Sequence, residues 1–136
     1  MSRNEFTWPV RVYYEDTDAG GVVYYANYLK FFERGRTEFL RALGFEQDEL
    51  RDRHGIIFAV RSIQADYLRP ARFNELLSVT CEITGCKRAS LEFFQRIMRD
   101  KEVLCEGRVR IACLEAAAFR PCSIPSFLWT ALQNHE

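Results

Sequence analysis

Paired metal ligands are nearly missing from this sequence. Its only histidines, His54 and His135, stand far apart, and none of its five cysteines has Cys-x-x-Cys spacing. Tetrahedral zinc sites need such paired ligands, so the composition argues against a zinc protein. The cysteine count is odd and three cysteines fall inside strand-like runs, which favours buried reduced thiols over a disulfide framework.

An excess of charge is missing as well. Lysine and arginine total 19 and aspartate and glutamate total 19, which argues against a strongly electrostatic nucleic-acid binder. No apolar run reaches the length of a membrane span, and the first residues, MSRNEFTWPV, contain no signal-like apolar segment. We therefore expect a cytoplasmic protein without an integral membrane segment.

The remaining composition is that of one folded domain. The 136 residues, 48% of them hydrophobic, suit a single domain over residues 1–136 better than two separate cores. Aromatic residues make up 14%, a large amount of ring surface for so short a chain to bury. We therefore expect a homo-oligomer, with dimers joined sheet edge to sheet edge and paired into a tetramer.

Hydrophobic periodicity predicts the secondary structure. A helical period predicts one long helix over residues 22–43 and shorter helices over residues 47–53 and 126–133. Alternation predicts strands over residues 6–14, 57–68, 77–83, 91–97 and 103–113. Gly85 and Asp100-Lys101 are the expected hairpin turns. This order indicates an α+β fold, with a mainly antiparallel five-stranded sheet wrapped around the long helix.

The common catalytic motifs are absent, including the Gly-x-Ser-x-Gly elbow, the His-Glu-x-x-His zinc motif and the glycine-rich phosphate loop. The segment Asp16-Thr17-Asp18, with Gly20 and Gly21 following, precedes the long apolar helix. A helix start offers unpaired N–H groups that stabilise an oxyanion, and a carboxylate such as Asp18 can attack or activate water. The alternative is that Asp18 is only a turn or cap residue.

The residues around Asp18 resemble a known family. The run RVYYEDTDAGGVVYYANY, residues 11–28, closely resembles the signature of hotdog-fold acyl-CoA thioesterases of the 4-hydroxybenzoyl-CoA thioesterase family. The runs FFERGRTE (31–38) and DYLRPAR (66–72), and the Arg-Pro and Ile-Pro pairs of residues 120–125, are similar to its Tol–Pal-associated, YbgC-like subgroup. The resemblance covers nearly the whole chain and implies a hotdog fold and hydrolysis of acyl-CoA to a free acid and coenzyme A.

The resemblance also implies residue roles. Asp18 matches the catalytic carboxylate, and the backbone N–H of Tyr25 matches the group that polarises the thioester carbonyl. Gly21 and Val22 would lie beside the substrate. Many relatives have histidine at the Tyr25 position; the backbone role survives that change, but a phenol of high pKa replaces the imidazole poorly as an acid or base. No cofactor is expected, because coenzyme A enters as part of the substrate.

Basic residues of the later strands are candidates for binding the carrier. Lys87, Arg88 and Ser90 follow Gly85 and can hold coenzyme A phosphates, although a solvated hairpin turn would look the same. Arg61 falls on a strand face with apolar residues and Tyr67, so an inward Arg61 would need an acid or a ligand.

Three other expectations complete the analysis. On the long helix, Glu33 is expected to pair structurally with Arg36. A non-catalytic scaffold or acyl-carrier-protein-binding hotdog protein is the alternative function, and acyl carrier protein is a possible partner in either case. A hotdog dehydratase would use a catalytic histidine, and none lies near the helix start.

Overall fold

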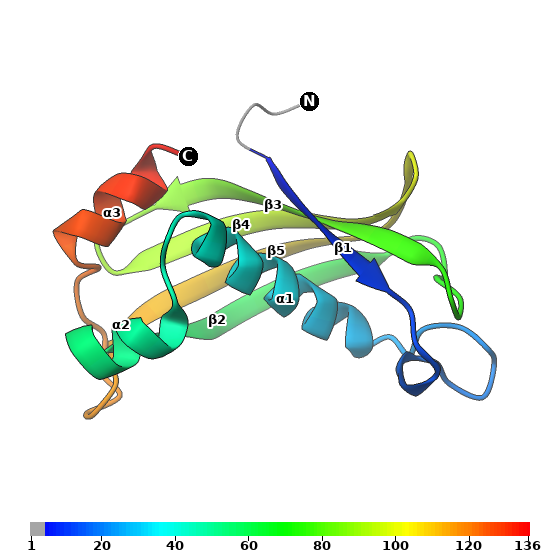
Figure 1. Ribbon diagram of the computed structural model, residues 1–136, viewed down its shortest axis with the longest axis horizontal. Coiled ribbons are helices and arrows are strands. Elements are labelled where there is room, and N and C mark those ends of the chain that lie inside the picture. Colours follow the sequence, from blue (N-terminus) through cyan, green and yellow to red (C-terminus); the bar gives the residue numbers. More distant parts are fainter. Residues whose placement is uncertain (1–4) are drawn as a thin grey trace.

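The computed structural model describes residues 5–136, which form one antiparallel sheet with a long helix against one face (Figure 1). The strands lie in the order β1-β3-β4-β5-β2. Their bounds are β1 Phe6–Arg11, β2 Ile56–Tyr67, β3 Leu76–Cys86, β4 Ser90–Arg99 and β5 Glu102–Glu115. The helices are α1 (Asn27–Ala42), α2 (Gln47–His54) and α3 (Ser126–Gln133), with a short 3-10 turn, η1 (Tyr14–Asp16). The predicted α+β fold with a five-stranded antiparallel sheet is confirmed.

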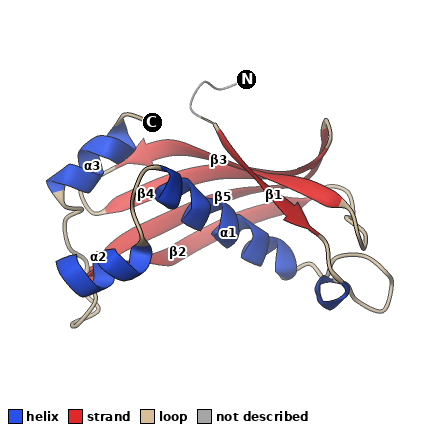
Figure 2. Ribbon diagram, viewed as in Figure 1, coloured by secondary structure: helices blue, strands red, loops and turns tan. Residues whose placement is uncertain are grey.

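The apolar stripe of α1 builds the centre of the core. Figure 2 shows α1 crossing the sheet obliquely, with α2 and α3 beyond its C-terminal end. Tyr28, Phe32, Gly35 and Phe39 recur every three or four residues and are all buried. This spacing places them on one helix face, toward the sheet. Each large apolar side chain buried there contributes about 1.5–3 kcal/mol, so the stripe fixes the position of α1.

Two glycines allow α1 to lie unusually close to the sheet. A Cβ atom on Gly35 would stand 2.7 Å from a methyl carbon of Val79, and one on Gly107 would stand 2.8 Å from the ring of Phe32. The side-chain amide of Gln95, on β4, donates to the main-chain carbonyl of Phe32 at 3.0 Å. A buried strand side chain therefore bonds directly to the helix backbone.

The start of α1 differs from the expectation, because residues 22–26 are not helical. Val22 forms a β-bridge with Arg72, and the Val23 N–H donates to the Ala71 carbonyl at 2.8 Å. These long-range bonds hold the two valines extended, a conformation that β-branched residues favour. The apolar pattern of the helix thus extends over residues 22–26, but the backbone of Val22 and Val23 pairs with the loop before β3 and does not become helical.

Two strand boundaries also differ. The first strand ends at Arg11 rather than at Tyr14, because the chain then turns into η1. Gly85 lies inside β3 beside a register shift, and the hairpin turn falls just after it, where the Lys87 N–H donates to the Ser90 carbonyl. The second expected turn is confirmed, with Asp100 at a φ of 54° between β4 and β5.

All five cysteines are free thiols, and Cys81, Cys105 and Cys113 are buried as expected, whereas Cys86 and Cys122 are partly exposed. Burial raises the pKa of the Cys105 thiol to about 12. Within residues 5–136, no helix combines the length and apolarity needed to cross a membrane.

The close approach of α1 predicts that Gly107→Ala destabilises the fold. The added methyl group overlaps the buried Phe32 ring, so we expect a loss of about 1–3 kcal/mol in the free energy of unfolding. Urea unfolding measures this loss. Gly85→Ala is the matched control, since its Cβ would meet Glu92 at an ordinary 3.6 Å. Equal stabilities of the two variants would contradict the close-packing account.

Candidate active site

The loop between β1 and α1 is anchored by a buried aspartate. The main-chain carbonyl of Asp16 accepts the Tyr24 N–H at 2.9 Å and the side-chain amide of Asn27 at 2.8 Å. Its carboxylate accepts the Tyr13 N–H at 2.8 Å. Asp16 and Asn27 are both buried, at 6% and 8% exposure. Asp16 therefore ties the loop to the first turn of α1.

Asp18 lies at the exposed part of this loop. Its carboxylate oxygen Oδ1 accepts the Gly20 N–H at 2.8 Å, and its main-chain carbonyl accepts the Gly21 N–H at 3.0 Å. Gly21 has a φ of 80°, which favours glycine there. The Asp18 N–H donates to the Val22 carbonyl at 2.9 Å. The backbone thus orients the carboxylate while leaving it open to solvent.

The same loop presents a free donor. Among the described residues, the Tyr25 and Ala26 N–H groups have no hydrogen-bond acceptor, whereas the flanking Tyr24 and Asn27 N–H groups are both paired. Because α1 begins at Asn27, Tyr25 lies just before the helix and not inside it as expected. Its N–H still lies at the N-terminal end of α1, where backbone N–H groups are unpaired and the helix dipole is positive.

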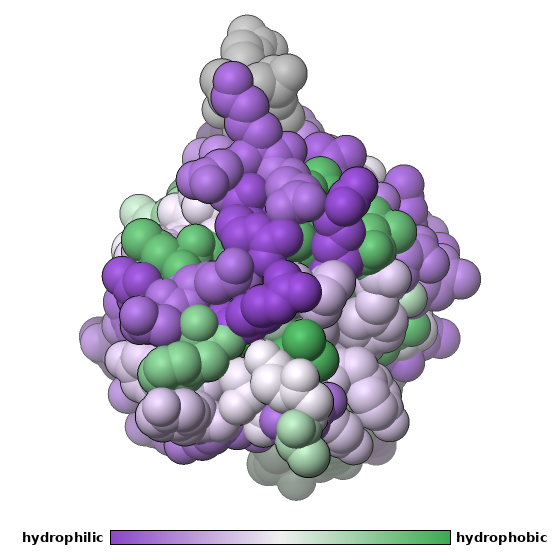
Figure 3. Space-filling model, turned by 90° about the vertical axis from the view of Figure 1, so that its right-hand side faces the viewer, coloured by the Kyte–Doolittle hydropathy of each residue, from purple (hydrophilic) through white to green (hydrophobic). Residues whose placement is uncertain are grey.

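Aromatic rings line this end of α1. The Tyr25 ring, 61% exposed, meets the Tyr67 ring edge-on at 6.1 Å, and Tyr67 in turn meets Tyr28 at 5.5 Å. The Tyr28 hydroxyl accepts the Ala71 N–H at 3.0 Å. Burial raises the pKa of both Tyr28 and Tyr67, which keeps these phenols neutral. The surface at this end is mostly hydrophilic with small apolar areas between (Figure 3).

Arg61 does not face the core. The pairing of β2 with β5 shifts register between Val60 and Ser62, so Arg61 is the extra residue of a bulge. The bulge separates Arg61 from Tyr67, which remains near α1. Instead, Arg61 lines a surface hollow with Lys87 and Arg110. Arg61 is exposed, so the expectation that it points inward is wrong, and its contact with a ligand stays a prediction.

That hollow is a basic one. Its charged side chains are three cations, Arg61, Lys87 and Arg110, and one carboxylate, Glu92, which pairs with Arg110 at 3.4 Å. Ser90 also lines it. Arg110 was missed in the sequence because it reads as an ordinary exposed position of an alternating strand. Only the pairing of β5 beside β2 and β4 brings it to the hollow.

Arg88 lies apart from Lys87. It lines a different hollow, with Trp129 and Ser126 of α3 and with Ser123. The Arg88 carbonyl accepts the Ile124 N–H at 2.8 Å, and the Trp129 indole donates to the Lys87 carbonyl at 3.2 Å. This hairpin is therefore packed against the C-terminal segment and is not a purely solvated turn.

The loop between β1 and α1, which carries Asp18, and the turn between β3 and β4, which carries Lys87, lie at opposite ends of one chain (Figure 1). The loop follows Arg11, which pairs with Leu76 at the start of β3, and Lys87 follows Cys86 at its end. The 11 residues of β3 span about 35 Å. One chain therefore does not bring Asp18 together with Lys87. The two histidines also lie away from the loop, since His54 packs on Phe127 and His135 on Phe39.

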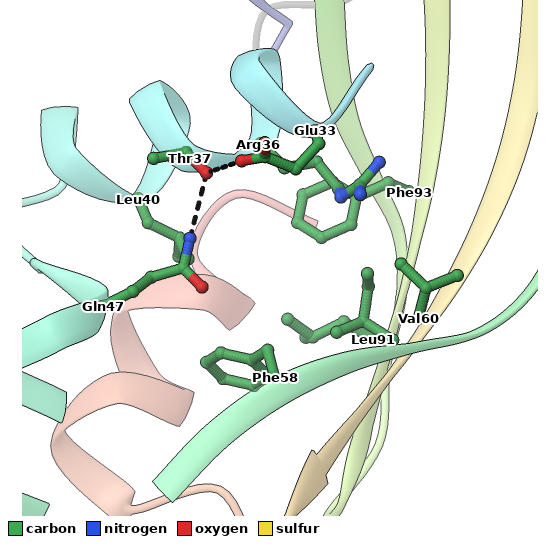
Figure 4. A pocket seen from close by; sticks show the side chains of 10 residues that line it. Glu33, Arg36, Thr37, Leu40, Gln47, Phe58, Val60, Leu91 and Phe93 are labelled. Carbon is green, nitrogen blue, oxygen red and sulfur yellow. Dashed lines mark hydrogen bonds between the residues drawn. The ribbon is translucent and has the colours of Figure 1, made fainter. Parts of the chain in front are cut away.

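Glu33 and Arg36 do not form the expected pair. Among the described residues, no ion pair joins them: the Thr37 hydroxyl donates to Glu33, and Arg36 donates to Gln95 at 2.9 Å. Both side chains instead line a cavity between α1, α2 and the sheet, shown in Figure 4.

The chain is similar to known thioesterases in sequence and in structure. Residues 12–132 match the Thioesterase-like superfamily. The acyl-CoA thioesterase YbgC of Haemophilus influenzae is 46% identical over 98% of both chains, and the acyl-CoA thioester hydrolase YbgC of Escherichia coli O157:H7 is 44% identical over 92% of this chain and 93% of its own. The crystal structure of a probable thioesterase from Bartonella henselae superposes with a TM-score of 0.86 and 36% identity, covering 89% of this chain and 99% of that one. The chain therefore belongs to the Thioesterase-like superfamily and has the hotdog fold.

Proposed function

We propose that this protein hydrolyses acyl-CoA thioesters to a free acid and coenzyme A, with Asp18 as the catalytic carboxylate. The observation that carries the proposal is one loop holding both an oriented, exposed carboxylate and the free Tyr25 N–H. The names of the YbgC relatives support acyl-CoA as the substrate class.

In this proposal the thioester carbonyl oxygen accepts the Tyr25 N–H. Negative charge grows on that oxygen during attack, so a fixed donor stabilises the transition state more than the ground state. Gly21 and Val22 border the acyl group, and the absent side chain of Gly21 leaves room for close approach. The phenol of Tyr25 has no part in the proton transfers.

Asp18 acts by one of two routes. As a nucleophile, its carboxylate oxygen attacks the carbonyl carbon, the C–S bond breaks, and water then hydrolyses the mixed anhydride. As a general base, it takes a proton from water, whose oxygen attacks while the thiolate leaves and is then protonated. A thiolate needs little acid assistance to leave, which suits a site with both histidines packed elsewhere.

The carrier phosphates bind in the basic hollow. Arg61, Lys87 and Arg110 outnumber the single carboxylate there, and Ser90 adds a hydroxyl donor. Phosphate oxygens form their strongest hydrogen bonds with such charged donors. Arg88 lies in the neighbouring hollow and is assigned a smaller part in binding.

A second copy of the chain completes the site. Within residues 5–136, β2 has only β5 as a neighbour, and its 12 residues leave a long free edge on which Val60 is 53% exposed. Such an edge is a template for another strand. Antiparallel pairing of β2 with β2 of a second copy would bring the Tyr67 end of one near the Arg61 half of the other. A tetramer of two such dimers stays a prediction.

Asp18→Asn is the direct test of the catalytic role. The change keeps the size and removes the charge, so we expect kcat to fall by roughly 100-fold or more with substrate binding largely kept. Asp52→Asn, on α2, is the matched control and should leave kcat unchanged. Single turnover in heavy-oxygen water tests the nucleophilic route: label in Asp18 shows that water opened an anhydride at the Asp18 carbonyl carbon, whereas label only in the released acid is produced by both routes. A fully active Asp18→Asn enzyme would show that Asp18 is not the catalytic carboxylate, whereas a wild-type protein without thioesterase activity would favour the scaffold function.

The phosphate site predicts a split between KM and kcat. Arg61→Ala and Lys87→Ala should each raise KM about tenfold with little change in kcat, because the lost hydrogen bonds are remote from the reacting carbonyl. Arg88→Ala, which neutralises the adjacent hollow, is the comparison and should change KM less. Steady-state kinetics with one acyl-CoA measures all three. A larger effect of Arg88→Ala would move the phosphates to the α3 hollow.

Sites shared between two copies predict complementation. In a mixed dimer of Asp18→Asn and Lys87→Ala chains, one site has both changes and the other has neither. Co-expressed chains with different tags should therefore recover a site with wild-type KM, at about half of the activity of the wild-type dimer. Light scattering should also find no monomer at micromolar concentration. A mixed dimer that keeps only the raised KM of Lys87→Ala would show that each chain binds its substrate alone.

A further inference from the structure

A cavity of about 120 Å³ lies beside the C-terminal half of α1, against the sheet (Figure 4). Its apolar wall comes from Phe58 of β2, Leu91 and Phe93 of β4, and Ile111 of β5. Cavities of about 150 Å³ in proteins accept a benzene-sized molecule, so this space suits a short aliphatic group.

The rim of the cavity is polar. The Gln47 amide donates to the Thr37 hydroxyl oxygen at 3.1 Å, and the Thr37 hydroxyl donates to the carboxylate of Glu33 (Figure 4). Glu33 is exposed, so water and Thr37 solvate its charge. The carboxylate therefore belongs to the opening and not to the buried part of the cavity.

Arg36 is the buried charge of this cavity. It is 9% exposed, and its one hydrogen bond to the part of the chain that the structure describes joins Nη1 to the Gln95 side-chain oxygen at 2.9 Å. Gln95 is fully buried, and its amide nitrogen is committed to the Phe32 carbonyl, which fixes the oxygen toward Arg36. Within residues 5–136, no carboxylate lies within ion-pair distance of Arg36.

A buried guanidinium with one neutral acceptor is an incomplete arrangement. Burial lowers the pKa of Arg36, but a guanidinium remains protonated and carries five N–H donors. Buried charges in proteins are normally matched by an opposite charge, because desolvation is costly otherwise. In the described residues no buried side-chain nitrogen is left without a partner, so the unbonded Arg36 donors reach solvent, and the cavity is the space beside them.

We propose that this cavity binds a small carboxylate, with Arg36 as its counter-ion and the apolar wall around a short aliphatic body. The inference rests on the proposed function, because thioester hydrolysis offers two kinds of molecule that carry such a carboxylate. One is an acyl-CoA whose acyl chain ends in a second carboxylate and whose thioester is hydrolysed at Asp18 of the neighbouring copy. Within one chain, Asp18 precedes α1 and the cavity lies along the C-terminal half of α1, too far for a short acyl chain to span. The other is a free carboxylic acid, the class of product that thioester hydrolysis releases. Arg36 recognises both by charge-assisted hydrogen bonds.

Length-matched substrates test the first source. We expect kcat/KM for glutaryl-CoA to exceed that for valeryl-CoA by at least about tenfold, and adipyl-CoA to exceed hexanoyl-CoA similarly. Arg36→Gln should remove this preference and leave hydrolysis of the neutral substrates within a few-fold of wild type. Arg34→Gln removes the same charge from an exposed position two residues away and should keep the preference. If Arg36→Gln does not fold, the wild-type preference decides this arm.

Free acids test the second source. Glutarate should inhibit hydrolysis of valeryl-CoA by the wild-type enzyme, and Arg36→Gln should relieve the inhibition at least about tenfold. Inhibition without a substrate preference identifies a free acid as the occupant. If the enzyme shows neither the substrate preference nor inhibition by glutarate, the proposal is overturned. If no acyl-CoA is hydrolysed at all, the proposed function fails, and calorimetric titration of the wild-type protein with glutarate still accepts or rejects the carboxylate site.

Discussion

The close contact between α1 and the sheet is the constraint on which the rest of the structure depends. Gly35 and Gly107 remove side chains where helix and strands meet, and the Phe32 ring fills the space over Gly107. Because the helix backbone lies so near β4, Gln95 reaches the Phe32 carbonyl and, through its other end, Arg36. The close packing of α1 on the sheet thus fixes the position of the helix axis and brings the buried Gln95 side chain within hydrogen-bond distance of it.

The active-site loop depends on the same helix, through Asn27 at its first turn. Asn27 holds the Asp16 carbonyl, and Asp16 holds the loop that carries Asp18. The anchoring aspartate is buried and the candidate catalytic aspartate is exposed, although they stand two residues apart. Asp16 is thus committed to backbone donors, while Asp18, the proposed catalytic carboxylate, is exposed and accepts one hydrogen bond from the Gly20 N–H.

The antiparallel sheet separates the two parts of the proposed site, the Asp18 loop and the basic hollow. A strand of 11 residues puts the loop after β1 and the hairpin after β3 at opposite ends of the molecule. A substrate whose reacting carbonyl and phosphates are bound by both ends therefore calls for a neighbouring chain. The free edge of β2 offers the surface on which that chain would pair. In the proposed function, sheet geometry and substrate length together make activity depend on oligomerisation.

The sequence by itself determined the fold class, α2, α3, the buried stripe of α1 and the loop that carries Asp18, because each depends on local periodicity or on a contiguous run of residues. Only the tertiary structure decided where α1 begins, since bonds to Ala71 and Arg72 keep Val22 and Val23 extended. The tertiary structure also decided that Arg61 lines the basic hollow, because the bulge in β2 has no signature in the residues around it. In the same way, the packing of α3 on the hairpin places Lys87 and Arg88 in different hollows. Helical spacing predicted Glu33 as the partner of Arg36. The hydrogen-bond partner in the structure is Gln95, which lies 59 residues away on β4 and therefore has no signature in the helix sequence.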